Sequence, residues 1–172
     1  IVNGHGSNQN LVEMAARLTV VEFPGVLCAA MFYLTGPRGR ATIDRVRESE
    51  YPGGIAHACE LETSLYLAIK PELVKMKEAV KEIGFPMSEF VFFDFVDGSV
   101  KMMEYWSSMS KSGVMGDPTK ASVEKGRVLL AAAADEVVEV VRDLRKRRIG
   151  KRVDHHGTRK VRGGVKKQVF AE

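Results

Sequence analysis

The order of apolar and polar positions in the first residues predicts a strand, a helix and a second strand. Ile1 and Val2 run directly into a polar turn, as the end of a buried strand does. Apolar residues then recur at helical spacing through residues 8–22, and residues 26–34 are almost continuously apolar, which is typical of a strand covered on both faces. A helix between two such strands predicts a β–α–β crossover and a parallel sheet.

Further helices and one aromatic strand are predicted downstream. A short helix is expected at residues 41–49, in a Gly- and Pro-rich excursion over the rim of the sheet, and two more are expected at residues 60–69 and 71–83. Residues 89–96 are aromatic and β-branched, which favours a strand or an extended packing segment. Its phenylalanines are expected in the core: Phe90, Phe92 and Phe93.

The clearest helical pattern covers residues 122–147. Its apolar positions form one stripe with charged neighbours, which predicts a helix lying on one face of the sheet. The stripe consists of Leu130, Ala134, Val137, Val138, Val141 and Leu144. Alternation of these helices with apolar strands indicates an α/β fold.

Composition and cysteine usage narrow the class of protein. The 172 residues are 45% hydrophobic and 28% charged, as in a globular domain large enough to bury a core. The sequence has no apolar run of roughly 18 residues and no secretory signal pattern at its start. Two cysteines, Cys28 and Cys59, are too few for a disulfide framework. We therefore expect a cytoplasmic protein without a membrane span.

Positive charge is concentrated in a tail. Residues 145–172 hold eleven Lys and Arg against two acids, whereas acids outnumber bases in residues 1–144. We therefore expect a folded part at residues 1–144 and a flexible basic tail at residues 145–172. Such a tail could bind the phosphates of a nucleic acid, although Phe170 is its single aromatic residue for stacking on bases.

Two polar turns hold the residues best suited to chemistry. His5 lies between glycines at the carboxyl end of the first predicted strand, where open α/β sheets bind ligands, although it could equally be a turn histidine bonded to the backbone. If a helix begins near Glu60, Glu62 lies in its first turn, where the helix dipole favours an ionised carboxylate able to bind a cation, and His57 just ahead could face the same pocket. The sequence leaves open whether Glu60 or Glu62 is the ligand. A Cys59–His57 nucleophile is a less favoured alternative.

Three motifs in this order resemble the creatininase (creatinine amidohydrolase) family. They are Asn3-Gly4-His5-Gly6-Ser7-Asn8, His57-Ala-Cys-Glu-Leu-Glu62-Thr63-Ser64-Leu65, and the segment from Gly113 to Gly126. The resemblance runs from residue 1 to about residue 145. It implies a three-layer α/β/α domain with a mostly parallel sheet, and hydrolysis of a cyclic or linear amide in a small-molecule substrate. It also implies two divalent ions (zinc, manganese or iron) and a homo-oligomer, often a hexamer.

The resemblance also assigns roles by position. It implies that His5 is a metal ligand, that His57 passes a proton near the substrate, and that Glu62 belongs to the metal centre. The family's acidic ligand two residues after the motif histidine is replaced here by Ser7, so Glu62 is our candidate for the missing carboxylate. The tryptophans that enclose creatinine in that enzyme are absent near residues 32–33 and 53–54, which argues against creatinine as the substrate.

Other ligands of the family, a Glu-x-His pair and a bridging Asp, come from an amino-terminal half that we expect this chain to lack. Two protein ligands are fewer than the three of a catalytic site. The sequence therefore predicts the carboxy-terminal part of a metal-dependent amidohydrolase, inactive as an isolated fragment. The alternative is a non-catalytic, hydrolase-like scaffold that binds nucleic acid through its basic tail.

Overall fold

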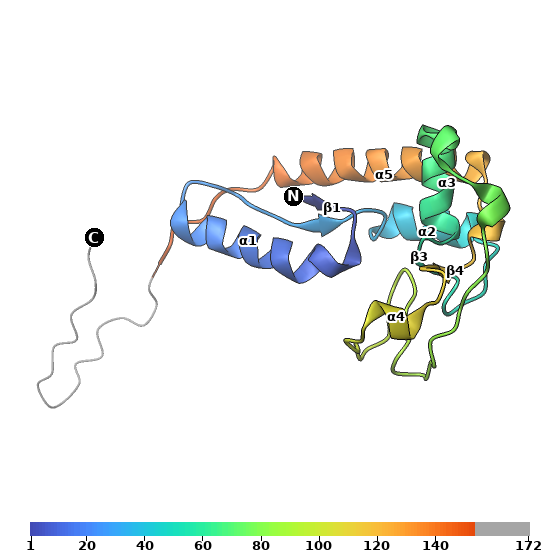
Figure 1. The fold of residues 1–172 in the computed structure, drawn as a ribbon. Coiled ribbons are helices and arrows are strands. Elements are labelled where there is room, and N and C mark those ends of the chain that lie inside the picture. Colours follow the sequence, from blue (N-terminus) through green and yellow to red (C-terminus); the bar gives the residue numbers. More distant parts are fainter. Residues whose placement is uncertain (154–172) are drawn as a thin grey trace, which may run out of the picture.

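The computed structural model describes residues 1–153 and begins with the predicted crossover (Figure 1). Strand β1 (Val2–Asn3) leads through a 3-10 turn (Gly6–Asn8) into helix α1 (Gln9–Glu22) and then to strand β2 (Met31–Phe32). The two strands pair in parallel, with Val2 opposite Met31. The crossover is confirmed, but β2 is shorter than the predicted strand at residues 26–34, because β1 offers it only two ladder positions.

The second part of the chain adds the elements that build the core. They are α2 (Pro37–Val46), β3 (Ile55–His57), α3 (Glu60–Ile69), 3-10 turns at Pro71–Leu73 and Met76–Glu78, the one-turn α4 (Trp106–Met109), β4 (Met115–Gly116), a 3-10 turn at Pro118–Lys120 and α5 (Val123–Leu144). Strands β3 and β4 pair antiparallel. Helix α2 begins four residues before the predicted 41–49 segment, because Pro37 suits a first helical turn.

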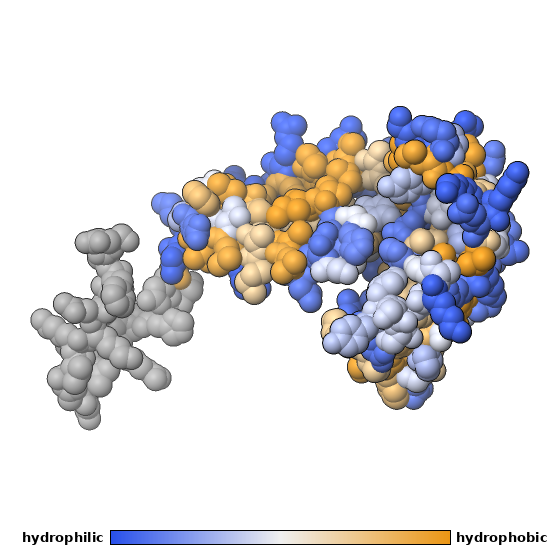
Figure 2. Space-filling model, viewed as in Figure 1, coloured by the Kyte–Doolittle hydropathy of each residue, from blue (hydrophilic) through white to orange (hydrophobic). Residues whose placement is uncertain are grey.

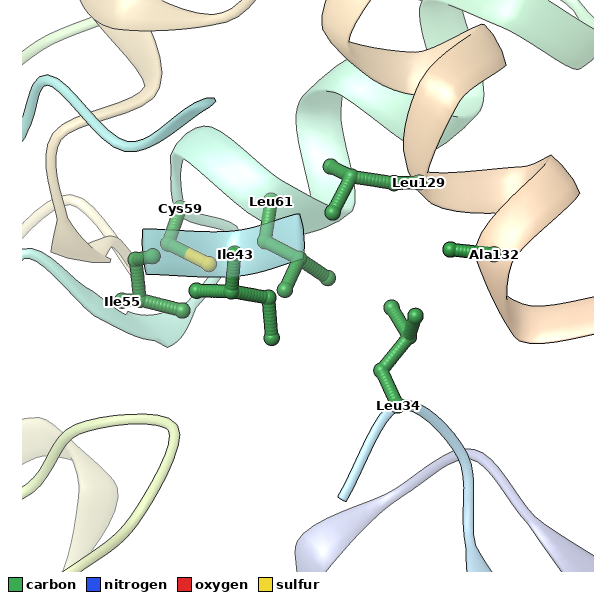
Figure 3. Close-up of a cluster of buried hydrophobic side chains, with 7 residues drawn as sticks. All are labelled: Leu34, Ile43, Ile55, Cys59, Leu61, Leu129 and Ala132. Carbon is green, nitrogen blue, oxygen red and sulfur yellow. The ribbon is translucent and has the colours of Figure 1, made fainter. Parts of the chain in front are cut away.

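The main core lies where α2, α3 and α5 meet the ends of β2 and β3 (Figure 3). Its buried members are Leu34, Ile43, Ile55, Cys59, Leu61, Leu129 and Ala132. Helices α3 and α5 approach closely because position 126 is glycine: a Cβ there would lie 1.8 Å from the carbonyl oxygen of Ser64. The Ser64 hydroxyl also accepts a hydrogen bond from the Ser122 N–H at the start of α5 (3.1 Å), which fixes the position of α5 against α3.

The buried face of α5 differs from the predicted apolar stripe. Its buried residues are Gly126, Leu129, Ala132 and Glu136. By contrast, Leu130, Val138 and Val141 of the predicted stripe are 43%, 45% and 49% exposed. The prediction was wrong because α2 and α3 pack where small residues admit them, and because a buried carboxylate caps α2: Glu136 Oε1 accepts a hydrogen bond from the Gly39 N–H (3.3 Å).

Two neighbouring leucines test this face of α5. Replacing Leu129 with alanine is expected to lower the free energy of unfolding by about 2–3 kcal/mol, because it leaves a cavity in the core. Leu130→Ala removes the same atoms from an exposed position, so a loss below about 0.5 kcal/mol is expected. Urea unfolding followed by circular dichroism measures both. Equal losses would contradict the observed orientation of α5.

Two other predicted elements are also absent. The helix predicted at residues 71–83 is replaced by single 3-10 turns, because Glu82 is drawn into a bridge with Gly116 of β4, with N–O distances of 3.0 and 2.8 Å. Residues 89–96 form no strand; they bend, and Val91 and Phe93 pack on a smaller cluster of Phe85, Met109 and Met115. Phe90 is 56% exposed, so its assignment to the core was wrong, while Phe92 and Phe93 are half-buried.

Helix α1 presents its apolar residues to solvent. Only Ala16 of its 14 residues is buried, and Leu11 and Val21 are 68% and 58% exposed. Figure 2 shows apolar side chains gathered over this region and the adjoining part of α5, in the same part of the molecule as the β1–β2 ladder. In the view of Figure 1, that ladder lies between α1 and α5.

The described residues contain no helix that is long and apolar enough to span a bilayer. Of the basic tail predicted at residues 145–172, residues 154–172 lie outside the described part of the chain. The predictions of flexibility and of nucleic-acid binding therefore fall outside the structure.

Candidate active site

A cavity of about 1010 Å³ opens where the ends of β1, β2 and β3 come together with residues 93–97 and the start of α4. His5, His57 and Glu62, the three residues singled out in the sequence, all line it. The imidazoles of His5 and His57 face one another edge to face, with ring centroids 6.4 Å apart and planes at 75°. Segments separated by about fifty residues in the sequence are thus brought to one place.

The loop that carries His5 is held by Asn3, a buried residue at the end of β1. Asn3 Oδ1 accepts a hydrogen bond from the His5 N–H (3.1 Å), and Asn3 Nδ2 donates to the His5 carbonyl oxygen (3.0 Å) and to Gln9 Oε1 (3.0 Å). On the imidazole, Nδ1 accepts a hydrogen bond from the Ser7 N–H (3.3 Å). The Asn-Gly-His motif therefore fixes the backbone of His5 and leaves its side chain at the cavity.

A strained turn places His57 and Glu62 together. Ala58, between β3 and α3, has a φ of 47°, in the left-handed region that residues other than glycine seldom adopt. Glu62, in the first turn of α3, reaches back so that its Oε2 accepts a hydrogen bond from the Ala58 N–H (2.6 Å). Among the described residues, its other carboxylate oxygen has no hydrogen-bond donor. This hydrogen bond ties the Glu62 carboxylate to the backbone next to His57, so the turn holds the two side chains at the same cavity.

Glu60 serves a different purpose. It is buried, and its carboxylate accepts hydrogen bonds from the N–H groups of Glu48 (3.0 and 3.1 Å) and Ser49 (2.8 Å) and pairs with Lys125. Burial alone would raise the pKa of Glu60, but the bonds from Lys125 and the backbone outweigh burial and lower it. The sequence left open whether Glu60 or Glu62 faces the site. In the structure Glu60 joins α3 to α5 through Lys125, and Glu62 lines the cavity.

The Cys59 thiol is poorly suited to be a nucleophile. Its side chain is buried in the main core, and burial raises the pKa of Cys59 to about 12. A thiol with such a pKa is protonated at neutral pH, and the thiolate is the reactive form. The geometry therefore gives no support to the Cys59–His57 alternative.

The donors match a divalent metal in type but fall short in number. Imidazole and carboxylate are typical ligands of zinc and manganese. However, no group of three or more His, Cys, Asp or Glu side chains within residues 1–153 is arranged to hold a metal ion. His5 and Glu62 line the same cavity, yet a catalytic metal site uses at least three protein ligands. The described part of the chain supplies at most part of a metal site.

The sequence did not predict the specific contacts that other side chains make around this cavity. Trp106 lies edge to face against His57, with ring centroids 4.7 Å apart, although the two are 49 residues apart in sequence. Tyr33 also lines the cavity; burial, followed by the nearby charge of Glu62, raises its pKa well above the ordinary range. The Asp94 carboxylate accepts hydrogen bonds from the two terminal guanidinium nitrogens of Arg47 (2.8 and 2.7 Å), which anchors the bent aromatic segment at residues 89–96. No periodic pattern marks such long-range contacts.

Comparison with known protein families identifies the family of this chain. The family model described as "Creatininase: Creatinine amidohydrolase" matches residues 1–141. The chain belongs to the creatininase family. The resemblance predicted from the three motifs is confirmed, and the chain is thereby placed in a family of amidohydrolases.

A curated relative is 35% identical to this chain over 137 residues: the mycofactocin precursor peptide peptidase of Mycobacterium ulcerans (strain Agy99). The match covers 80% of this chain and 45% of that protein. The chain therefore spans about half the length of the relatives that it matches.

Solved structures show the same α/β fold. A putative creatinine amidohydrolase from Bacteroides fragilis NCTC 9343 superposes with a TM-score of 0.67 at 24% identity, over 88% of this chain and 55% of that one. A mutant creatininase described as Zn-Zn type gives 0.59 at 21% identity, over 83% and 54%. The predicted creatininase-like α/β fold is thus confirmed, and the solved creatininases include a Zn-Zn type and a Mn form.

Proposed function

We propose that this chain carries the His5–His57–Glu62 cluster of a divalent-metal-dependent amidohydrolase. The observation that supports the proposal most is the convergence of these three side chains on one cavity in a member of the creatininase family. Since the chain spans about half the length of its relatives, the remaining metal ligands would come from outside the described residues. The complete enzyme is expected to be active, and the isolated chain is expected to be inactive.

The residues of this chain divide the work. His5 and Glu62 would hold a cation, which when bound would polarise an amide carbonyl as a Lewis acid. His57 lies 6.4 Å from His5, between ring centroids, so a substrate at the cation would be within its reach. In the hydrolysis, water adds to the carbonyl carbon and gives up one proton, the C–N bond breaks, and His57 passes that proton to the leaving nitrogen as general base and then general acid.

A linear amide in a peptide is the favoured substrate. The curated relative at 35% identity is named as a peptidase that acts on a precursor peptide. The cavity, at about 1010 Å³, has room for a ligand much larger than a small cyclic amide, and aromatic residues such as Phe32 and Phe95 line it. Cytoplasmic location and assembly as a homo-oligomer, often a hexamer in the family, stay predictions of the sequence.

Metal binding by the full-length chain tests the ligand assignment. We expect His5→Ala and Glu62→Gln each to weaken binding of Zn²⁺ by about tenfold or more, because each removes one of few donors. Isothermal titration with Zn²⁺ measures the affinity. Glu50→Gln is the control, since Glu50 is exposed and pairs with Lys81 at 2.7 Å outside the cavity. Affinity for Zn²⁺ that neither cavity variant changes would refute the assignment.

A further inference from the structure

The orientation of the His57 imidazole depends on its aromatic neighbours. Within residues 1–153, no hydrogen bond joins a ring nitrogen of His57 to another group, whereas the His5 ring accepts one from Ser7. The rings of Trp106 and His5 are the aromatic groups in contact with His57, at centroid distances of 4.7 and 6.4 Å. Histidines that act in catalysis are usually oriented by a partner on the imidazole. For His57 the nearer aromatic contact is Trp106, whose ring lies edge to face against the imidazole.

The environment of Trp106 is not that of a core residue. It stands at the first position of α4, while Met109 at the last position of α4 is buried against Phe85 and Met115. Met109 therefore anchors the one-turn helix, and Trp106 remains 44% exposed while lining the cavity. A large aromatic side chain left half in solvent, with its ring at 75° to an imidazole, has the geometry of a favourable edge-to-face pair.

We propose that Trp106 is a positioning residue that holds the His57 imidazole in the orientation needed for proton transfer. The inference rests on the proposed function, because orientation of His57 matters only if His57 moves a proton. An aromatic pair of this kind biases one rotamer of the imidazole over the others. Trp106 belongs to α4, far from β3 in the sequence, so its contact with His57 holds α4 against the site.

The contact can be tested without any substrate. Trp106 is the single tryptophan of the chain, so the indole emission of the protein reports this side chain alone. An imidazole in contact with an indole quenches its emission, so His57→Ala is expected to raise the emission of the folded protein. In concentrated urea the two proteins should emit equally, which serves as the control. Equal emission in the folded state as well would overturn the proposal.

Kinetics of the complete, metal-loaded enzyme then test the positioning role, with creatinine and the mycofactocin precursor peptide as probes. Trp106→Leu is expected to lower kcat by about three- to tenfold with KM unchanged, and Trp106→Phe to recover most of the loss, because a phenyl ring keeps the edge-to-face contact. Unchanged kcat in Trp106→Leu, or a raised KM alone, would overturn the positioning role.

The outcomes for Trp106 and for the proposed function are distinguishable. If His57→Ala abolishes hydrolysis while Trp106→Leu does not change kcat, the proposed function stands and the role of Trp106 falls. If neither probe is hydrolysed by the complete, metal-loaded enzyme, the proposed function falls, and the emission comparison still decides whether Trp106 and His57 are in contact. Urea unfolding of Trp106→Leu shows whether a loss of kcat merely follows a loss of folding.

Discussion

His57→Ala is expected to lower kcat of the complete, metal-loaded enzyme by about 10²- to 10⁴-fold, the usual contribution of a positioned general acid. The imidazole lines the cavity at the end of β3 and faces both His5 and Trp106. Among the described residues its ring makes no hydrogen bond that the fold would lose. The free energy of unfolding is therefore expected to change by less than about 1 kcal/mol. Hydrolysis of the mycofactocin precursor peptide or of creatinine measures the first quantity, and urea unfolding measures the second.

Two comparisons make the result specific to His57. Glu50→Gln alters an exposed ion pair with Lys81 and should keep full turnover. Removing the divalent metal with a chelator should abolish hydrolysis in the wild-type protein, and adding Zn²⁺ or Mn²⁺ should restore it there but not in His57→Ala. A His57→Ala enzyme with undiminished kcat would remove His57 from the mechanism.

The elements nearest the cavity were predictable because local sequence determines them. An apolar pair ending in Asn-Gly-His, a helical repeat and a second apolar run are sufficient to predict the β1–α1–β2 crossover. Likewise a Gly-Gly turn before Ile55 and a helix that begins at Glu60 place His57 and Glu62 at adjacent positions around one turn. Polar residues concentrated at strand ends are a signal of a site that a single sequence can carry.

The features that sequence did not predict depend on contacts between distant segments. Periodicity located α5 but chose Leu130 over Leu129, because the face of a helix is decided by what packs on it. The ion pair of Glu60 with Lys125 joins residues 65 apart, and no local pattern in the sequence identifies Glu60 as the buried partner of Lys125. For the same reason the sequence did not predict the contact between Trp106 and His57.

The exposed apolar face of α1 illustrates a related limit. The repeat of Leu11, Leu18 and Val21 identifies a helix with one apolar side, and the structure contains that helix. The repeat carries no information about which segment, if any, packs on that apolar side. The match covers only about half the length of the relatives, so a repeat in these residues alone predicts the apolar face and not what packs on it.

The second large effect is expected at Glu60, whose replacement by glutamine should lower the free energy of unfolding by about 3 kcal/mol. Its side chain is 3% exposed and that of Lys125 is 13% exposed, so the variant leaves a largely buried ammonium without its nearest carboxylate. The amide of glutamine would also turn a donor toward the N–H groups of Glu48 and Ser49. Glu48→Gln is the matched control: Glu48 pairs with Lys125 at 2.8 Å but is 62% exposed, so a loss below about 1 kcal/mol is expected.

The dependence of this effect on pH has a definite sign. The pKa of Glu60 is lower in the folded protein than its ordinary value of 4.5, since bonds from Lys125 and the backbone outweigh burial. A carboxyl with a depressed pKa in the folded state stabilises the fold fully above its unfolded pKa, and this contribution is lost as the pH falls through the folded value. The difference in unfolding free energy between wild type and Glu60→Gln should therefore be constant near neutral pH and shrink below pH 4.5. Urea unfolding across that range measures it, and a difference that grows toward acid pH would show that Glu60 is not held as an ionised partner of Lys125.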